Sequence, residues 1–140
     1  MIAHTGLAVK SYEQGKAFYE KALAPLGYKV NLEYGVAAGF MSGGETDFWI
    51  VVKKRPQAGH VAFKAEGKKA VDAFHRAALR AGGTDNGAPG YRPDYWPGYY
   101  AAFVLDADGN NVEAVWYDYS KVKPAKKTAK KAVKKTAQKR

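Results

Sequence analysis

HTGLAV at residues 4–9 and HVAFKA at residues 60–65 decide the fold, because each stretch opens one copy of an internal repeat. The copies are offset by 56 residues, the interval from His4 to His60. Self-similarity at a fixed interval indicates one supersecondary unit used twice. We therefore predict that both histidines occupy the same place on a sheet. The matched identical pairs are His4 and His60, Ala17 and Ala73, Phe18 and Phe74, Ala22 and Ala78, Leu23 and Leu79, and Gly27 and Gly83.

Each copy is predicted to form a βαβββ unit. Ser11 and Gln14 suit a capping box at the start of the first helix, which Pro25 and Gly27 end. The predicted fold class is α+β, with two such units forming a curved mixed sheet and one helix packed on it per unit. The units span 1–53 and 59–118 within one domain, 1–120. Strands are predicted at 4–9, 28–33, 36–40, 47–52, 60–65, 99–105 and 112–117, and the second helix at 66–81.

Side-chain alternation along these strands predicts which groups face away from the helices. In the first strand Leu7 and Val9 share one face, which should pack under the helix, and this leaves His4 on the open face. The same reasoning places His60 on the open face of the fifth strand. In the last strand Glu113 falls on that face too, and a carboxylate there is costly to bury unless it has a partner.

Composition excludes several classes of protein. The chain has 140 residues and no cysteine, so disulfides, thiolate metal sites and cysteine nucleophiles are excluded. No run of about 18 apolar residues predicts a membrane span, and no secretory leader is recognisable. We expect a cytoplasmic location and no membrane partner.

The stretches HTGLAV, GHVAF and DADGNNVEAVWY (residues 106–117) together resemble the vicinal oxygen chelate superfamily. This superfamily includes glyoxalase I, extradiol dioxygenases and bleomycin-resistance proteins. The resemblance covers residues 1–117 and implies the glyoxalase-like fold. It does not choose a reaction, because this scaffold serves several chemistries and some members only bind ligands.

The resemblance implies metal ligands at His4, His60 and Glu113, whereas Trp49 stands where the first unit would supply a further ligand. Two histidines and one carboxylate suit a divalent metal such as Fe, Mn, Zn or Ni, which would support lyase- or dioxygenase-type chemistry. A cavity without metal that sequesters a ligand, as in bleomycin resistance, is the alternative. In glyoxalase-like arrangements the two halves of a site come from different chains, so a homodimer is expected.

An aromatic stretch at residues 90–100 predicts a pocket for a flat aromatic or oxygenated small molecule. Alternatively, these rings only close the end of the sheet or form a dimer contact. No catalytic base is identified, although Tyr95, Tyr99 and Asp94 are candidates for handling protons if they reach the site. His75 is predicted to be a partly exposed helix residue rather than a ligand. The predicted substrate-binding residues are Trp49, Phe40, Tyr95, Trp96, Tyr99 and Tyr100.

The tail at residues 121–140 carries the whole net charge of +10, because it holds ten of the 23 Lys and Arg residues and none of the 13 acids. Such a segment should be disordered alone. It resembles the tails of linker histones, and it is predicted either to bind nucleic acid without sequence preference or to be only a solvated appendage. The candidate contacts are Lys126, Lys127, Lys130, Lys131, Lys134 and Lys135.

Overall fold

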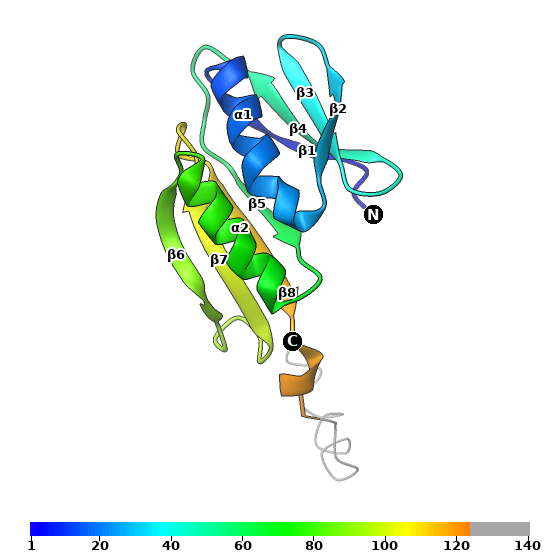
Figure 1. Cartoon of the computed structure of the whole chain (residues 1–140), viewed down its shortest axis with the longest axis vertical. Coiled ribbons are helices and arrows are strands. Elements are labelled where there is room, and N and C mark those ends of the chain that lie inside the picture. The colour runs from blue at the N-terminus through cyan, green and yellow to red at the C-terminus, as the bar shows by residue number, and fades with distance from the viewer. Residues whose placement is uncertain (124–140) are drawn as a thin grey trace, which may run out of the picture.

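A computed structural model describes residues 1–123, and the candidate tail contacts from Lys126 to Lys135 lie outside them. Two units follow one another along the chain (Figure 1). The first comprises β1 (Thr5–Val9), α1 (Tyr12–Leu23), the short 3-10 helix η1 (Ala24–Leu26), β2 (Lys29–Glu33), β3 (Ala37–Met41) and β4 (Thr46–Val52). The second comprises β5 (His60–Lys64), α2 (Lys68–Arg80), β6 (Thr84–Tyr91), β7 (Tyr99–Leu105), β8 (Asn111–Tyr117) and the 3-10 helix η2 (Tyr119–Lys121).

The two units have the same topology, which confirms the predicted α+β fold. Their strand orders are β1-β4-β3-β2 and β5-β8-β7-β6. In each unit the first and last strands pair in parallel, and the remaining pairs are antiparallel. Both helices lie on the same side of the sheets, as Figure 1 shows, so the opposite faces carry no helix.

The strand β6 has no counterpart among the predicted ranges. Its sequence, TDNGAPGY, reads as turns because Gly, Pro, Asn and Asp dominate it. It nevertheless pairs with β7, with register shifts between Asp85 and Gly87 and between Gly87 and Gly90. As an edge strand it tolerates Pro89, since the missing N–H is not needed by a second neighbour.

Both units contribute to one hydrophobic core under the helices. The rings of Phe48 from β4 and Phe63 from β5 meet edge to face, with centroids 4.9 Å apart. Tyr28 packs on the same Phe63 ring at 5.3 Å. The capping prediction is confirmed for Ser11, whose hydroxyl accepts from the Gln14 N–H at 3.2 Å. The shared core means that neither sheet is an independent domain.

A buried polar network also joins the units. Asp106, in the turn between β7 and β8, accepts hydrogen bonds from the Tyr19 hydroxyl at 2.6 Å and from the Asn110 side-chain amide at 2.8 Å. The same amide donates to the Ala8 carbonyl at 2.9 Å, and its carbonyl accepts from the Gly59 N–H at 2.8 Å. Burial, followed by the Asp106 charge, raises the pKa of Tyr19 far above its ordinary value, which keeps its hydroxyl a donor. The network therefore fixes β1 and α1 against the second unit.

Within residues 1–123, no helix is both long and apolar enough to cross a lipid bilayer.

Candidate functional site

A buried carboxylate with two polar partners lies on the helix-free face of the second sheet. Glu113, in β8, is only 2% exposed. One of its oxygens accepts from His60 Nε2 at 2.8 Å, and the other accepts from the Tyr99 hydroxyl. Because β5 and β8 pair with Ala62 opposite Glu113, the sheet register brings the histidine and the carboxylate onto one face. The polar partner required by a buried carboxylate is thus present.

The Tyr99 hydroxyl is held as a hydrogen-bond donor. Burial, followed by the hydrogen bond to Glu113, raises the pKa of Tyr99 well above its ordinary value. The backbone fixes this side chain in place, because Gly98 lies so close to Asp118 that there is no space for a Cβ atom. Asp118 also donates its backbone N–H to the Gly98 carbonyl at 2.7 Å. The glycine therefore sets the start of β7 against the end of β8.

An aromatic hollow of about 390 Å³ opens beside this carboxylate; we call it the aromatic pocket. Trp96 packs edge to face on Tyr117 and on Tyr119, with centroid distances of 5.6 and 5.1 Å. Tyr99 packs in the same way on Tyr117 at 5.6 Å and on Tyr95 at 5.2 Å. Tyr99 thus belongs to both the pocket wall and the carboxylate cluster. The pocket is lined by Lys64, Tyr95, Trp96, Tyr99, Tyr117 and Tyr119.

Lys64 is the cationic group of the pocket. Its Nζ lies 5.7 Å from the centroid of the Tyr117 ring, within range of a cation–π contact. The side chain is exposed, and no salt bridge among the described residues includes it. A flat ligand with a negative group would therefore meet stacking surfaces and a positive charge in one place.

Two predicted pocket residues lie instead in the core, on the helix side of the sheets. Phe40 is fully buried and pairs in register with Phe48, next to the open-face pair Gly39 and Trp49. Tyr100 is buried, and its hydroxyl donates to Asp72 of α2 at 2.7 Å. Both corrections follow from strand alternation, because consecutive residues such as Tyr99 and Tyr100 point to opposite faces.

Trp49 stands at the position equivalent to Glu113, as the two registers show. It lies opposite Gly6 in the first unit, whereas Glu113 lies opposite Ala62 in the second. Its ring stacks on Tyr34, with centroids 6.0 Å apart and planes at 13°. Trp49 therefore belongs to the sheet of the first unit, and it is not among the residues that line the aromatic pocket.

His4 does not join His60 and Glu113 within one chain. It lies just before β1 in a hollow that it shares with residues 61–64 of β5, and His60 does not line that hollow. By contrast Gly59, next to His60, sits against the Leu7 side chain, so β1 and β5 run in opposite directions. Accordingly, the described residues contain no group of three or more His, Cys, Asp or Glu side chains placed to hold a metal.

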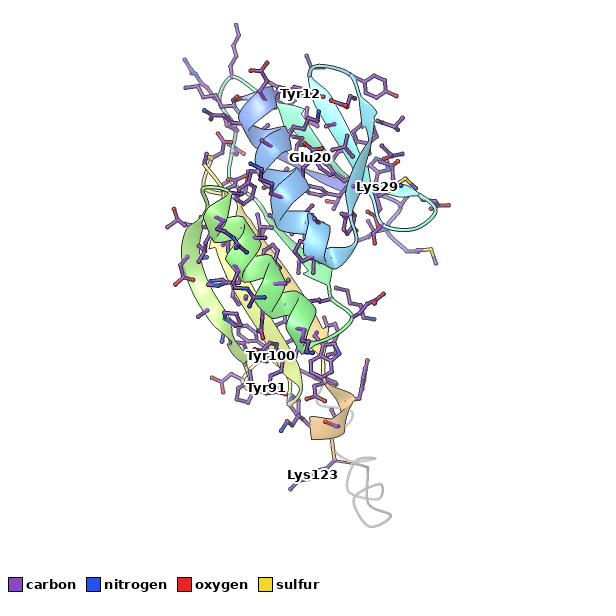
Figure 2. The ribbon with its side chains drawn as sticks, in the orientation of Figure 1. Tyr12, Glu20, Lys29, Tyr91, Tyr100 and Lys123 are labelled. Atoms are coloured by element: carbon purple, nitrogen blue, oxygen red, sulfur yellow. The ribbon has the colours of Figure 1, made fainter. Side chains whose placement is uncertain are left out.

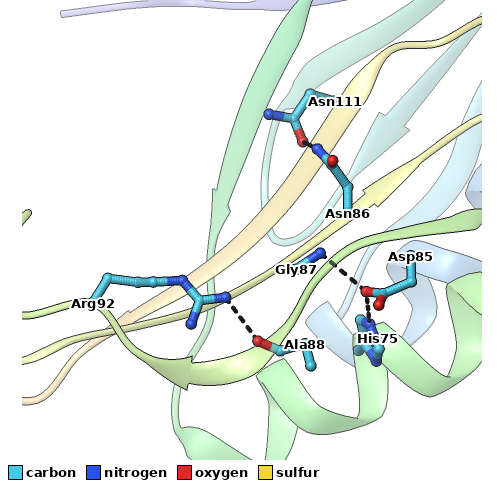
Figure 3. Close-up of polar contacts among 7 residues, drawn as sticks. All are labelled: His75, Asp85, Asn86, Gly87, Ala88, Arg92 and Asn111. Atoms are coloured by element: carbon cyan, nitrogen blue, oxygen red, sulfur yellow. Dashed lines mark hydrogen bonds and ion pairs between the residues drawn. The ribbon is translucent and has the colours of Figure 1, made fainter.

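His75 has a structural partner, in keeping with its predicted place on the second helix. Its Nε2 lies 2.9 Å from Asp85 Oδ1, which also accepts from the Gly87 N–H (Figure 3). Nearby, Arg92 donates to the Ala88 carbonyl at 2.7 Å. The His75 contact ties the glycine-rich strand β6 to α2, away from the aromatic pocket, and the other two brace β6 itself. The candidate proton-handling residue Asp94 is exposed and lines none of the aromatic pocket.

Three lining residues of the pocket were missed by the sequence analysis: Lys64, Tyr117 and Tyr119. Alternation could have found the first two. Tyr117 lies four residues after Glu113 in β8, and Lys64 lies four residues after His60 in β5. An even spacing along a strand keeps two side chains on the same face. Tyr119 follows the last strand in η2, and no strand pattern reaches it.

Comparison with known proteins matches nearly the whole described chain. The sequence model of the Glyoxalase/Bleomycin resistance protein/Dioxygenase superfamily matches residues 1–114. A glyoxalase/bleomycin resistance protein from Albidiferax ferrireducens is similar in structure, with a TM-score of 0.74 and 28% identity over 84% of this chain and 99% of that one. A lactoylglutathione lyase from Agrobacterium tumefaciens shares the fold, with a TM-score of 0.64 and 20% identity over 83% and 92% of the two chains. No curated protein matches the sequence.

Proposed function

The chain belongs to the Glyoxalase/Bleomycin resistance protein/Dioxygenase superfamily, and we propose that it binds a flat aromatic small molecule carrying one negative group in the aromatic pocket. The single observation that supports this most strongly is the double role of Tyr99. Its ring lines the pocket, while its hydroxyl donates to the buried Glu113 carboxylate. This function needs no metal, as in the ligand-sequestering members of the superfamily.

The rings supply the contact area for such a ligand. Trp96 is half-buried and is braced by Tyr117 and Tyr119, so its face is presented at small cost in side-chain freedom. Stacking on such rings is worth about 0.5–1.5 kcal/mol beyond the area it buries. Tyr95, which is 64% exposed, leaves the pocket open toward solvent.

The polar groups supply orientation. Lys64 attracts a carboxylate or phenolate at the rim of the pocket, and because this lysine is exposed the attraction weakens as salt rises. The Tyr99 hydroxyl is already committed to Glu113, so its proton is not free for a ligand oxygen until that bond opens. The ligand is therefore expected to place its ring on Trp96 and its charge near Lys64.

Isothermal titration calorimetry with 2-naphthoate, in the presence of a chelator, tests this proposal. We expect binding, with cyclohexanecarboxylate weaker because it lacks a flat ring and 2-naphthol weaker because it lacks the charge. The variant Trp96→Ala should weaken 2-naphthoate binding by about tenfold, which corresponds to about 1.4 kcal/mol. The matched variant Trp49→Ala removes the same ring from the other sheet and should leave the affinity unchanged. Equal losses in the two variants, or no preference among the three probes, would contradict the proposal.

A second candidate function, metal binding, is favoured by the contact between His60 and Glu113. Imidazole nitrogen and carboxylate oxygen are ligands that divalent transition metals accept. Within residues 1–123, one chain does not fit such a metal, because only these two groups come together and Glu113 already accepts from His60 and Tyr99. In this candidate function the third ligand is His4 of a second copy, which makes a homodimer necessary.

Mixing two inactive variants separates a shared site from a site within one chain. His4→Ala and Glu113→Ala should each abolish high-affinity zinc binding, measured by competition with a chromophoric chelator. A mixture that is unfolded and refolded together should recover a fraction of the sites, because some dimers then carry one intact half from each variant. Zinc binding that survives His4→Ala, or a mixture that recovers none, contradicts the shared site.

A further inference from the structure

A second hollow of about 440 Å³ adjoins the aromatic pocket, and we call it the side hollow. It is lined by Lys64, Ala65, Glu66, Trp116, Tyr117 and Tyr119. Three of these side chains, Lys64, Tyr117 and Tyr119, also line the aromatic pocket, so the two spaces lie on either side of one shared wall. A ligand that places its ring on Trp96 and its charge near Lys64 therefore leaves the side hollow unfilled.

The side hollow lies where the chain leaves the second sheet. Its lining residues fall within 64–66, at the end of β5 and just after it, and within 116–119, at the end of β8 and the start of η2. This is the end of the molecule at which Figure 2 labels Lys123. Tyr119 is 69% exposed, which leaves the hollow open to solvent. Its volume is within the range of about 300–1,000 Å³ that suits drug-sized ligands.

The side hollow has apolar walls and a charge opposite to that of the shared wall. Ala65 is buried, and Trp116 is partly buried and packs against the core, which holds its ring in place. Glu66 is exposed, and none of the salt bridges within residues 1–123 includes it. A negative group of a ligand is therefore attracted to Lys64 on the shared wall and repelled by Glu66 within the hollow.

We propose that the ligand of the aromatic pocket has a second, uncharged apolar arm next to its negative group, and that this arm occupies the side hollow. The proposal rests on the function proposed above, because it extends the same ligand. The ring lies on Trp96, the carboxylate lies near Lys64, and the arm lies against Trp116. The ligand class is then an aromatic acid whose carboxylate stands between two apolar groups, as in an N-aroyl derivative of a hydrophobic amino acid.

Isothermal titration calorimetry of the full chain with three probes, in the presence of a chelator, tests this proposal. N-(2-naphthoyl)glycine has the ring and the carboxylate but no arm, N-(2-naphthoyl)-L-phenylalanine adds a benzyl arm, and N-(2-naphthoyl)-L-glutamate adds a negatively charged arm. We expect the phenylalanine derivative to bind about tenfold more tightly than the glycine derivative, because its benzyl group leaves water for an apolar space. The glutamate derivative should bind no more tightly than the glycine derivative, because Glu66 repels its second carboxylate.

Two variants locate the arm. Trp116→Phe should reduce the tenfold preference to about threefold, because the smaller ring offers less contact, and should leave the affinity for the glycine derivative unchanged. Trp49→Phe makes the same change on the other sheet and should preserve the preference. Glu66→Gln alters only an exposed side chain and should raise the affinity for the glutamate derivative by about threefold. By NMR, the indole N–H signal of Trp116 should move with the phenylalanine derivative and stay in place with the glycine derivative.

Equal affinities for the glycine and phenylalanine derivatives, when both bind, would overturn the side-hollow proposal and leave the pocket proposal standing. A preference that is unchanged in Trp116→Phe, or a Trp116 signal that does not move, would place the arm elsewhere and overturn it as well. If neither 2-naphthoate nor the glycine derivative binds, the function proposed above fails, and this proposal fails with it.

Discussion

At the position where β4 carries Trp49, β8 carries Glu113, and this one difference separates the open faces of two otherwise equivalent sheets. Trp49 stacks on Tyr34, so the first face presents flat rings to solvent. Glu113 binds His60 and Tyr99, so the second face holds a buried polar cluster next to an aromatic pocket. A duplicated backbone therefore does not imply a duplicated site.

The turns before β4 and β8 differ in a similar way. In the first unit, the side chain of Ser42 makes its hydrogen bond within its own unit, to the Leu26 carbonyl at 3.4 Å. In the second unit, Asp106 and Asn110 reach across to Tyr19 and Ala8 of the first. The second turn thus holds the two units together, while the first only closes a hairpin.

The largest expected effect comes from breaking this second turn. Asp106→Ala leaves the Tyr19 hydroxyl and the Asn110 amide short of an acceptor, together with the N–H groups of Asp108 and Asn110. Buried unsatisfied groups cost about 1–3 kcal/mol each, so we expect a loss of at least about 3 kcal/mol in the free energy of unfolding. Urea denaturation measures it. Ser42→Ala in the equivalent turn should change stability by less than about 0.5 kcal/mol, and similar losses from the two variants would refute the distinction.

The second-largest loss of stability is expected from filling the space beneath the Trp49 ring with a Cβ atom at Gly39. A Cβ atom at Gly39 would lie 2.6 Å from Thr46 Cγ2 and about 3 Å from the Trp49 ring. Thr46 cannot turn away freely, because its hydroxyl donates to Asn31 at 2.9 Å. Gly39→Ala should therefore lower the free energy of unfolding by about 1–3 kcal/mol and shift the tryptophan emission. Gly44→Ala is the control, since a Cβ there meets open space; an unchanged emission in Gly39→Ala would count against this packing.

A smaller effect is expected from removing one hydroxyl in each unit. Tyr99→Phe leaves one Glu113 oxygen without its donor, and we expect a loss of about 1–2 kcal/mol in unfolding free energy. Tyr34→Phe keeps the stack on Trp49 and removes a hydroxyl from a side chain that is 65% exposed, so it should have almost no effect. Thermal and urea unfolding measure both variants. A larger loss of stability in Tyr34→Phe than in Tyr99→Phe would contradict the difference between the two units.

The smallest expected effect is a pH dependence from β6, where Asp85 pairs with His75 of α2; in the equivalent strand β2, Glu33 pairs instead with Lys16 of α1. The hydrogen bond from His75, followed by that from the Gly87 N–H, lowers the pKa of Asp85. A folded-state pKa below the unfolded value means that the contribution to stability is present above the unfolded pKa, near 4, and is lost as pH falls through the folded pKa. Asp85→Asn should therefore flatten the decline of stability below about pH 4. Urea unfolding of the unsubstituted chain and of Asp85→Asn across that pH range measures the effect. Identical pH dependence in the two would contradict a contribution from Asp85.

The sequence predicts the fold well because the repeat and the alternation both report on backbone position. They place His60 and Glu113 on one face, and the sheet register then makes them neighbours. The same alternation excludes Phe40 and Tyr100 from the pocket when it is applied within each strand. Two things lie beyond sequence patterns: the pairing of the glycine-rich β6, and the position of Tyr119 after the last strand. How β1 lies against β5, which separates His4 from His60, is set by packing between the units.

The most direct test of the account follows the indole N–H signals of the three tryptophans by NMR while 2-naphthoate is added. Trp96 lines the aromatic pocket, Trp49 lies on the open face of the other sheet, and Trp116 packs against the core. We predict that the Trp96 signal moves in proportion to the bound fraction while the Trp116 signal stays in place, and that Lys64→Gln weakens the response. A Trp96 signal that does not move while Trp49 responds would contradict the claim that the second unit carries the ligand site.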